Sequence, residues 1–522
     1  MVFIWLLVPS AVFAQSYDLI LKGGRIIDGT GNPWFYGDVA IRDQKIAAIG
    51  KLDPSVADSV IDVKGLIVAP GFIDVHTHIE KFDLSVPTSG NFVSNGVTTV
   101  ITGNCGGSRT DIIRYFFQLD SAKMSVNVAT LVGHNSIRSE VMGASQRIPS
   151  IEEQARMEAL VEQAMRAGAV GLSTGLIYTP GTYSETSEVI GLARAAAKYN
   201  GVYASHIRNE SDKVHDAIAE ALNVGRQAGI PVQISHFKVA GKSNWGRSKE
   251  TLGYIEQARK EGIDVTVDQY PYIASSTSLS TMLPSWVFSG GKDSLMARLG
   301  DNGMRKKIIS EMVKGVKARR VKNYAYAVVA MYEADTTLNG KNISQINKLK
   351  GRKTTARAEA ETIIEMMEEG GAQMVFFTMN EDDVTRIMQY PFTMIASDAG
   401  IVPFGRGVPH PRSYGTNARV LGHYVREKKV LRLEEAIRRM TSLPAQKFQL
   451  RDRGLVRQGM AADLVVFDEK TIMDMSTFTD PHAYSTGFAF VIINGTITVA
   501  DGRHTGARNG RILKGPGTGQ SY

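Results

Sequence analysis

The middle of this 522-residue chain alternates short apolar β-type runs with helical segments, and this alternation limits the folds that the chain can adopt. We expect eight strands, at 67–75, 98–102, 127–132, 170–173, 202–205, 232–235, 264–268 and 393–397. Helical segments lie between several of them, for example at 151–167, 186–199, 213–229 and 249–261. Strand, loop and helix repeated eight times predict an α/β fold, a (β/α)8 barrel of the TIM type.

The two ends of the chain have a different sequence pattern, in which short β-type runs are separated by glycines. We expect residues 15–66 and 451–508 to form one small domain, a β-sandwich or β-barrel, with the barrel at 67–450. The interval at about 284–380 interrupts the barrel rhythm and is predicted to be an insertion between strands 7 and 8. Its charged helix at 358–369 is either a lid or a covering helix, and the tail at 509–522 is predicted to be loose.

The first 14 residues read MVFIWLLVPSAVFA, an apolar run that is too short to cross a bilayer. Val12 and Ala14 stand where a signal peptidase requires small residues. We therefore expect a signal peptide at 1–14 and an exported protein, periplasmic or secreted, with no membrane association once the leader is removed. The alternative is a buried strand at the start of the fold.

Composition narrows the function classes further. Lys and Arg number 60 against 52 Asp and Glu, and these charges are spread along the chain without an arginine-rich arm, so we do not expect nucleic-acid binding. The share of apolar residues, 43%, excludes a disordered chain. The one cysteine excludes an internal disulfide framework and a zinc site built from several cysteines.

Five of the predicted strands end in polar residues that can bind a metal ion. The candidate ligands are His76 and His78 after the first strand, Cys105 after the second, His206 after the fifth, His236 after the sixth and Asp398 after the eighth. Each residue alone is more typical of a buried core residue or a helix cap. The carboxyl ends of barrel strands meet at one face, however, and barrels carry their catalytic groups there. The joint pattern therefore predicts a metal site.

The ligand types indicate zinc. Imidazole and thiolate ligands suit Zn²⁺ and disfavour Mg²⁺ or Ca²⁺. Binding would also account for the single cysteine, because a bound thiolate is shielded from oxidation in an oxidising compartment. Six candidates exceed the four ligands of a closed structural site, so we expect one or two metal ions with an open position.

Longer motifs around these ligands resemble the N-acyl-D-amino-acid deacylase (D-aminoacylase) family of the amidohydrolase superfamily. The resemblance covers nearly the whole chain after the leader. Its segments are VAPGFIDVHTH (68–78), GNCG (103–106), SHIRNE (205–210), SHFK (235–238), YPYIASST (270–277), SDAG (397–400), HPRSYGT (410–416) and GLVRQGMAAD (454–463). The HxH pair marks only the superfamily, whereas the Asn-Cys-Gly segment combined with Ser-His-Phe-Lys and His-Pro-Arg is far more specific.

The resemblance implies how the metals are held. It places a tightly bound zinc ion on Cys105, His206 and His236, and a second, weaker site on His76, His78 and Asp398. The fourth strand, GLSTG at 171–175, contains no lysine that could bridge two metals, so the bridging role is expected of Cys105. The family often has two acidic residues after HxH, whereas this chain has Ile79-Glu80, a departure that concerns the surroundings of the second metal.

These pieces predict hydrolysis of an amide by a metal-activated water. Asp398 would accept the proton of that water and donate it to the departing amine. The α-carboxylate of a substrate needs a cation, and both Lys238 and Arg412 follow barrel strands close to the ligands.

The resemblance assigns carboxylate recognition to Lys238 and Arg412, and it adds a tyrosine and a serine of the 270–277 segment. Tyr270 and Ser276 are the best matches, with Tyr272 and Ser278 as alternatives, and Tyr178 matches a substrate-contacting tyrosine. His134 either supports the site or has a structural role, and Trp245 is expected to pack near the barrel mouth.

The sequence thus predicts an exported, zinc-dependent enzyme that hydrolyses N-acyl-D-amino acids to a carboxylate and a free D-amino acid. The D-stereochemistry comes from the resemblance alone. A cyclic amidase, of the hydantoinase or dihydroorotase kind, and an isoaspartyl-type dipeptidase stay open, although two cations favour a substrate with a free carboxylate. A zinc-binding protein without catalytic activity is a further alternative.

Overall fold

The structure, a computed structural model, describes residues 16–80 and 86–519, and its parallel strands follow one another in chain order. One sheet has the order β17-β13-β12-β11-β10-β9 and another the order β6-β7-β8. Their bounds are β6 Phe72–Asp74, β7 Val97–Thr102, β8 Asn127–Thr130, β9 Val132–Gly133, β10 Gly171–Gly175, β11 Val202–His206, β12 Val232–Ile234, β13 Val265–Gln269 and β17 Thr393–Ile395. A parallel bridge between Thr77 and Ala399 brings the first and last of these strands together, so the sheets are consistent with a barrel.

Two predicted strands are each divided in the structure. The run at 67–75 contains β5 (Ile67–Pro70) and β6, which belong to different sheets and are separated by Gly71. A side chain at Gly71 would collide with the side chain of Thr98, so the backbone at Gly71 lies directly against β7. The run at 127–132 is likewise divided into β8, which pairs with β7, and β9, which pairs with β10.

The predicted helices lie close to the observed ones. The four that the sequence predicts between the parallel strands are α4 (Ile151–Ala167), α5 (Thr186–Ala197), α6 (Val214–Ala228) and α7 (Ser248–Lys260). Further helices are α1 (Gly90–Val93), α2 (Ile112–Ala122), α3 (His134–Met142), α12 (Glu381–Gln389), α13 (Arg412–Arg419), α14 (Leu433–Met440) and α15 (Ser442–Lys447). The start of α4 is fixed by Ser150, whose hydroxyl accepts from the backbone N–H of Glu153 in a capping box.

Strands from both ends of the chain form one nine-stranded sheet with the order β21-β20-β19-β18-β5-β1-β2-β3, in which β4 pairs with β1. Its strands are β1 Leu19–Ile26, β2 Phe35–Arg42, β3 Lys45–Gly50, β4 Val60–Asp62, β5, β18 Leu464–Phe467, β19 Phe488–Ile493, β20 Thr496–Ala500 and β21 Arg503–His504. The pairing of both ends agrees with the prediction, but the sheet continues through β5 to Pro70, beyond the predicted boundary at residue 66.

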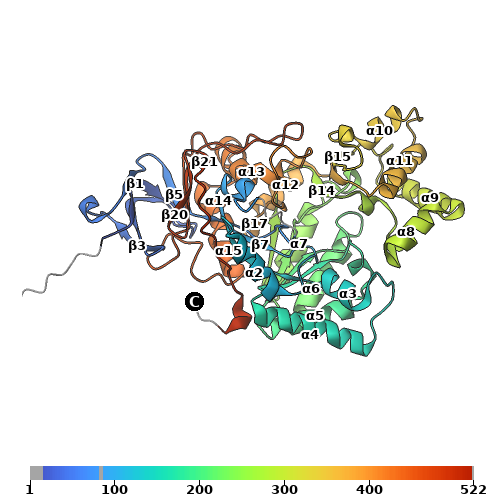
Figure 1. Cartoon of the computed structure of the whole chain (residues 1–522), viewed down its shortest axis with the longest axis horizontal. Helices are drawn as coiled ribbons and strands as arrows, with labels where there is room; N and C mark the ends of the chain where they lie inside the picture. Colours follow the sequence, from blue (N-terminus) through green and yellow to red (C-terminus); the bar gives the residue numbers. More distant parts are fainter. Residues whose placement is uncertain (1–15, 81–85, 520–522) are drawn as a thin grey trace, which may run out of the picture.

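Between β13 and β17 the chain forms additional elements with their own hydrophobic cluster, at the opposite end of the molecule from the nine-stranded sheet (Figure 1). They are β14 (Ser275–Ser278), α8 (Gly291–Gly300), α9 (Asn302–Ala318), β15 (Ala327–Met331), α10 (Ile343–Leu349), α11 (Ala356–Glu368) and β16 (Gln373–Phe376). The strands form a three-stranded antiparallel sheet with β16 in the middle. Because β14 belongs to this sheet, the additional elements begin before the predicted start at residue 284.

The tail differs from its prediction in the part that the structure describes. Residues 509–519 are not loose, since Leu513 is buried and its backbone N–H donates to the carbonyl of Val128. Glycines made the tail look loose in sequence, but at Gly510 and Gly515 they allow close contact with the backbone of Val126 and Ala169. The predicted signal peptide at 1–14 lies outside the described residues. Within the described residues, no helix combines the length and the apolar character that a membrane span needs.

Candidate metal centre

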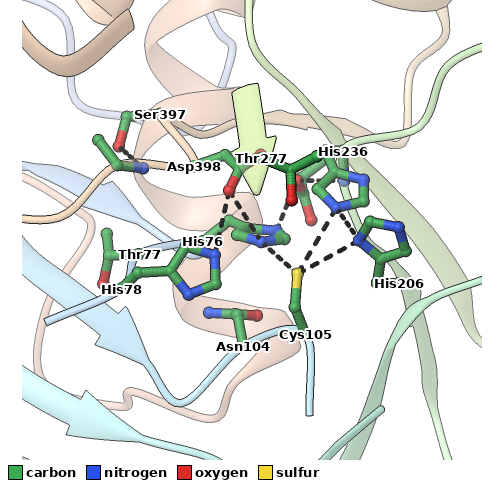
Figure 2. Close-up of polar contacts among 12 residues, drawn as sticks. His76, Thr77, His78, Asn104, Cys105, His206, His236, Thr277, Ser397 and Asp398 are labelled. Carbon is green, nitrogen blue, oxygen red and sulfur yellow. Dashed lines mark hydrogen bonds and ion pairs between the residues drawn. The ribbon is translucent and has the colours of Figure 1, made fainter. Parts of the chain in front are cut away.

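Cys105 lies in the middle of a cluster of imidazoles at the carboxyl ends of the parallel strands (Figure 2). Its Sγ atom is 3.3 Å from His76 Nε2, 3.5 Å from His206 Nδ1 and 3.6 Å from His236 Nε2. The two last nitrogens are 2.7 Å apart. Four side chains that are far apart in sequence thus present their donor atoms to one small volume.

The remaining two predicted ligands adjoin this cluster. His78 Nε2 is 3.1 Å and His76 Nε2 is 3.6 Å from Oδ1 of Asp398. The other carboxylate oxygen of Asp398, Oδ2, is 2.8 Å from Nη1 of Arg412. Asp398 therefore lies between the imidazoles and a buried guanidinium group. Burial alone would raise the pKa of the Asp398 carboxyl, but Arg412 and His76 lower the pKa well below its usual value, so this carboxylate is ionised at neutral pH.

Three of the ligands have an unusual backbone conformation. Cys105, His236 and Asp398 have φ angles of 52°, 36° and 52°, in the left-handed region that residues other than glycine rarely adopt. Each of them lies at the start of the loop that follows a parallel strand. Such conformations cost roughly 1–3 kcal/mol each and persist where the surrounding structure fixes them. Here they direct three side chains inward to the cluster.

The protonation states of the cluster suit a metal ion. Burial is the main cause that lowers the pKa of His206 well below its usual value, and the nearby His236 adds to this effect. Burial also lowers the pKa of His236, and the nearby Lys238 adds to this effect. Burial raises the pKa of the Cys105 thiol well above its usual value, and the Asp398 carboxylate adds to this rise. Neutral imidazole is the form that binds metal, and a buried thiolate needs a cation beside it. Two imidazoles and one sulfur are ligands typical of zinc.

A cavity of about 520 Å³ opens in front of the cluster. Its lining includes the predicted substrate-binding residues Lys238, Tyr270 and Arg412. The Tyr270 ring lies between the two cations, 5.6 Å from Lys238 Nζ and 4.6 Å from the Arg412 guanidinium carbon, each measured to the ring centroid. All three side chains are almost fully buried. The cavity therefore contains two buried cations beside the metal ligands, and recognition of a carboxylate needs such groups.

Comparison with known proteins gives the context of this site. Residues 59–499 match the amidohydrolase family. The chain belongs to this family. It is 35% identical to D-aminoacylase of Alcaligenes xylosoxydans xylosoxydans, over 96% of this chain and 98% of the relative. It is 37% identical to N-acyl-D-glutamate deacylase of the same organism, over 96% of this chain and 97% of the relative.

A solved structure supports the same relationship at the level of the fold. N-acyl-D-glutamate deacylase from Bordetella bronchiseptica, complexed with zinc and a phosphonate inhibitor that mimics the tetrahedral intermediate, superimposes with a TM-score of 0.81. The sequence identity is 36%, and the match covers 96% of this chain and 100% of the other. The fold of this chain is therefore an amidohydrolase-type fold.

The candidate ligands of this amidohydrolase fall into three overlapping groups, and within each group the donor atoms lie within 4.8 Å of one another. The groups are His76, His78 and Cys105; Cys105, His206 and His236; and His76, His236 and Asp398. The second group is the one that the sequence predicts for the tightly bound ion. The residues predicted for the second ion, His76, His78 and Asp398, are neighbours but are divided between the other two groups, so the two predicted sites share one continuous cluster.

Two carboxylates next to this cluster were not predicted as site residues. Glu210 Oε1 lies 2.9 Å from His236 Nδ1 and accepts from Lys238 Nζ at 2.5 Å. Asp268 Oδ1 lies 3.3 Å from His76 Nδ1 and accepts from the backbone N–H of His236 at 2.7 Å. Both have sequence signals: Glu210 follows His206 by four residues in the SHIRNE segment, and Asp268 is a polar residue at the carboxyl end of an apolar strand.

The remaining predicted substrate residues also reach the cavity. Tyr178 and Ser276 belong to its lining. The Tyr178 hydroxyl is 3.0 Å from the Thr277 hydroxyl, and the Ser276 carbonyl accepts from Arg412 Nη2 at 3.1 Å. The alternatives lie elsewhere, since the Tyr272 hydroxyl approaches the carbonyl of Pro411 at 3.5 Å and the Ser278 hydroxyl accepts from the backbone N–H of Ser280.

His134 and Trp245 do not line the cavity. His134 is fully buried, and its Nε2 lies 2.7 Å from Glu188 Oε1 in a buried ion pair, which favours a structural role. The Trp245 indole donates to the carbonyl of Thr378 at 2.9 Å and is 39% exposed.

Proposed function

We propose that this amidohydrolase cleaves N-acyl-D-amino acids to a carboxylate and a free D-amino acid. The observation that carries the proposal is a single cavity in which metal ligands, an ionised Asp398 and two buried cations meet. Cations beside a hydrolytic centre suit a substrate that has a free carboxylate close to its scissile amide. The names of the two relatives, D-aminoacylase and N-acyl-D-glutamate deacylase, support the same substrate class.

Zinc is the metal that the ligands fit. Cys105, His206 and His236 would hold one ion tightly, and His76, His78 and Asp398 would hold a second, weaker one, with Cys105 between them. Bound there, zinc lowers the pKa of a coordinated water to about 7 and polarises the amide carbonyl. The solved structure of a relative complexed with zinc supports this choice of metal.

Asp398 moves the proton in the proposed reaction. Its ionised carboxylate accepts a proton from the attacking water, and it delivers this proton to the amine nitrogen as the carbon–nitrogen bond breaks. Arg412, which contacts Asp398 Oδ2 at 2.8 Å, keeps the carboxylate ionised and oriented. Water and amide thus yield one carboxylate and one amine.

Five residues would bind the substrate. Lys238, Arg412, Tyr178, Tyr270 and Ser276 line the same cavity, and we assign the α-carboxylate to Arg412 with Lys238, Tyr270 and Ser276. Lys238 Nζ donates to Glu210 at 2.5 Å, and this contact fixes the position of the ammonium group. Because an ammonium group has more than one N–H donor, Lys238 can still donate to a substrate. Tyr178 would contact the substrate near the metal, because its ring centroid lies 4.7 Å from that of His206.

The finer organisation of the chain is part of the proposal. We propose a closed (β/α)8 barrel that runs from β6 to about residue 450, with the additional elements between strands 7 and 8, and a small β-domain of the sandwich or barrel type built from both ends and β5. We also propose that the protein is exported to the periplasm or secreted, on the strength of the leader at 1–14.

Replacing Asp398 tests the mechanism. Asp398→Ala is expected to lower kcat for an N-acetyl-D-amino acid by roughly 10²- to 10⁴-fold, because the proton carrier is lost. Asp382→Ala, which removes an exposed carboxylate on α12, is the matched control and should leave turnover unchanged. Unchanged turnover in Asp398→Ala would exclude this proton-transfer scheme. Turnover of hydantoins or dipeptides in place of acylated D-amino acids would favour the cyclic amidase or dipeptidase alternatives.

A further inference from the structure

One wall of the substrate cavity is formed by the loop that connects β17 to α13. Ile401, Val402, Pro403 and Arg406 of this loop line the cavity. Every residue between β17 and α13 is described by the structure, and none of them belongs to a helix or a strand. The shape of this wall therefore depends on contacts that the loop makes with neighbouring segments.

The imidazole of His482 contacts the centre of the loop at two points. The backbone N–H of Gly405 donates to His482 Nδ1 at 3.1 Å, and His482 Nε2 lies 3.0 Å from the carbonyl oxygen of Gly407. A backbone N–H only donates and a carbonyl only accepts, so we assign the tautomer that carries its proton on Nε2. In this tautomer His482 bridges the residues on both sides of Arg406.

The two residues that His482 contacts have little conformational preference of their own. Gly405 and Gly407 have φ angles of +85° and +69°, and glycine adopts positive and negative φ angles about equally readily. At the end of the loop, the backbone N–H of Val408 donates to the carbonyl of Ala330 at 2.7 Å. The centre of the loop, by contrast, is held through the side chain of His482.

His482 itself stands on a fixed base. It belongs to the connection between β18 and β19 of the nine-stranded sheet, where the Ser476 hydroxyl donates to the carbonyl of Pro481 at 2.7 Å. The Ser485 hydroxyl donates to the carbonyl of Tyr414 at 3.1 Å, and the Tyr414 hydroxyl lies 3.1 Å from His482 Nδ1. Because Tyr414 is part of α13, His482 joins this helix, the loop before it and the small sheet.

The reacting groups are held by different contacts. The backbone N–H of Asp398 donates to the carbonyl of His76 at 2.8 Å, and the Asp398 carboxylate contacts Arg412 at 2.8 Å. These contacts do not involve His482. Loss of the imidazole should therefore release the cavity wall and leave the proton carrier and the metal ligands in place.

We propose that His482 is a positioning residue for substrate binding, which holds the loop after β17 in the shape that completes the cavity. The inference rests on the proposed function and adds a residue to it. A wall that is ordered in advance costs little conformational entropy when a substrate binds, whereas a released loop has to be ordered at that moment. The effect therefore falls on KM and not on kcat.

Substitutions of His482 separate binding from chemistry. His482→Leu is expected to raise KM for an N-acetyl-D-amino acid about tenfold and to leave kcat within about twofold. His482→Asn keeps an acceptor at the position of Nδ1, so its KM should stay within about threefold of the parent value. His215→Leu, the same substitution at another half-buried histidine, on α6, is the matched control and should change neither constant. An unchanged KM in His482→Leu, or an Asn variant no better than the Leu variant, would overturn the inference and leave the proposed function standing.

Hydrogen exchange tests the contact without a substrate. At equal zinc content, the amide of Gly405 is expected to exchange about tenfold faster in His482→Leu than in the parent protein, and His482→Asn should slow it again. Equal exchange in all three proteins would exclude the positioning role, whatever the activity. A parent protein that hydrolyses no N-acyl-D-amino acid would overturn the proposed function and the effect on KM, and faster exchange in His482→Leu would then show that the imidazole holds the loop but serves another substrate.

Discussion

Glu210 and Lys238 both contact the Nδ1 atom of His236, at 2.9 Å and 2.8 Å. A carboxylate only accepts hydrogen bonds, and Glu210 already accepts from Lys238, so we assign a proton on His236 Nδ1 to the contact of 2.9 Å with Glu210. The other nitrogen, Nε2, then presents its lone pair to the cluster, where it lies 3.6 Å from Cys105 Sγ. With the proton assigned in this way, Glu210 selects the tautomer that binds metal, as carboxylates behind metal-binding histidines generally do.

Glu210→Gln tests this role at the scale of one residue. The variant keeps the shape and removes the charge, and the affinity for zinc is expected to fall by roughly 10- to 100-fold. Competition with a chelator measures the affinity, and thiol labelling reports occupancy without ambiguity because Cys105 is the one cysteine of the chain. The matched control is Glu140→Gln, at an exposed position of α3. Equal zinc affinity in the two variants would show that Glu210 only supports the fold.

The sequence predicts the ligands better than it predicts their partners, and the reason is local. A ligand such as His206 or Asp398 interrupts an apolar strand at its carboxyl end, and strand periodicity alone gives its direction. Glu210 is different, because its contact with Lys238 depends on how two loops meet in space. Such contacts between loops leave no periodic signal in the chain.

At the scale of elements, the loop after β7 sets the position of Cys105. Gly106 has a φ of +75°, and a side chain there would collide with the amide of Asn135 and approach the backbone nitrogen of Gly175 to 2.7 Å. Since Gly175 ends β10, the loop after β7 packs against the end of β10 with no room for a methyl group. The position of the thiol therefore depends on backbone packing between two loops of the barrel.

Gly106→Ala is expected to displace this loop and to lower both zinc content and stability. Overpacking costs about 1–3 kcal/mol, and the left-handed backbone adds about 1 kcal/mol. Gly229→Ala is the matched control, because Gly229 ends α6 with a φ of +63° and has no neighbour within 4 Å of the added carbon. The control should lose only the smaller amount and keep its zinc. Full zinc content in Gly106→Ala, measured by elemental analysis, would contradict the argument.

The boundaries of the strands are not predicted by hydrophobic patterns in two places. The run at 67–75 is apolar except for Asp74 near its end, so hydrophobicity predicts one strand. The structure divides it into β5 and β6 at Gly71, where the backbone lies against the side chain of Thr98. The additional elements before β17 begin at β14, whose residues are all serine or threonine and carry no hydrophobic alternation. A strand whose pairing partner lies almost a hundred residues away is specified by the fold and not by its own composition.

At the scale of the whole molecule, both ends of the chain return to the barrel. The β-type runs at both ends predict that the two ends pair, and the nine-stranded sheet does contain strands from both ends. The tail was predicted to be loose because it is rich in glycine. In the structure, Val128 donates to the carbonyl of Arg511 at 2.9 Å, and Leu513 donates to the carbonyl of Val128 at 2.8 Å. Composition reports the flexibility of an isolated segment, whereas burial depends on the surface that the segment meets.

Leu513 belongs to the hydrophobic cluster formed by barrel strands, which includes Ile101 and Leu131, and only 4% of it is exposed. Leu513→Ala should therefore destabilise the whole barrel by about 2–5 kcal/mol, the usual cost of emptying a leucine site in a core. Leu349→Ala removes the same atoms at a position of α10 that is 66% exposed, and it should cost less than about 0.5 kcal/mol. Thermal unfolding monitored by circular dichroism compares the two variants. Similar midpoints would mean that the tail lies on the surface of the barrel in solution and does not complete its core.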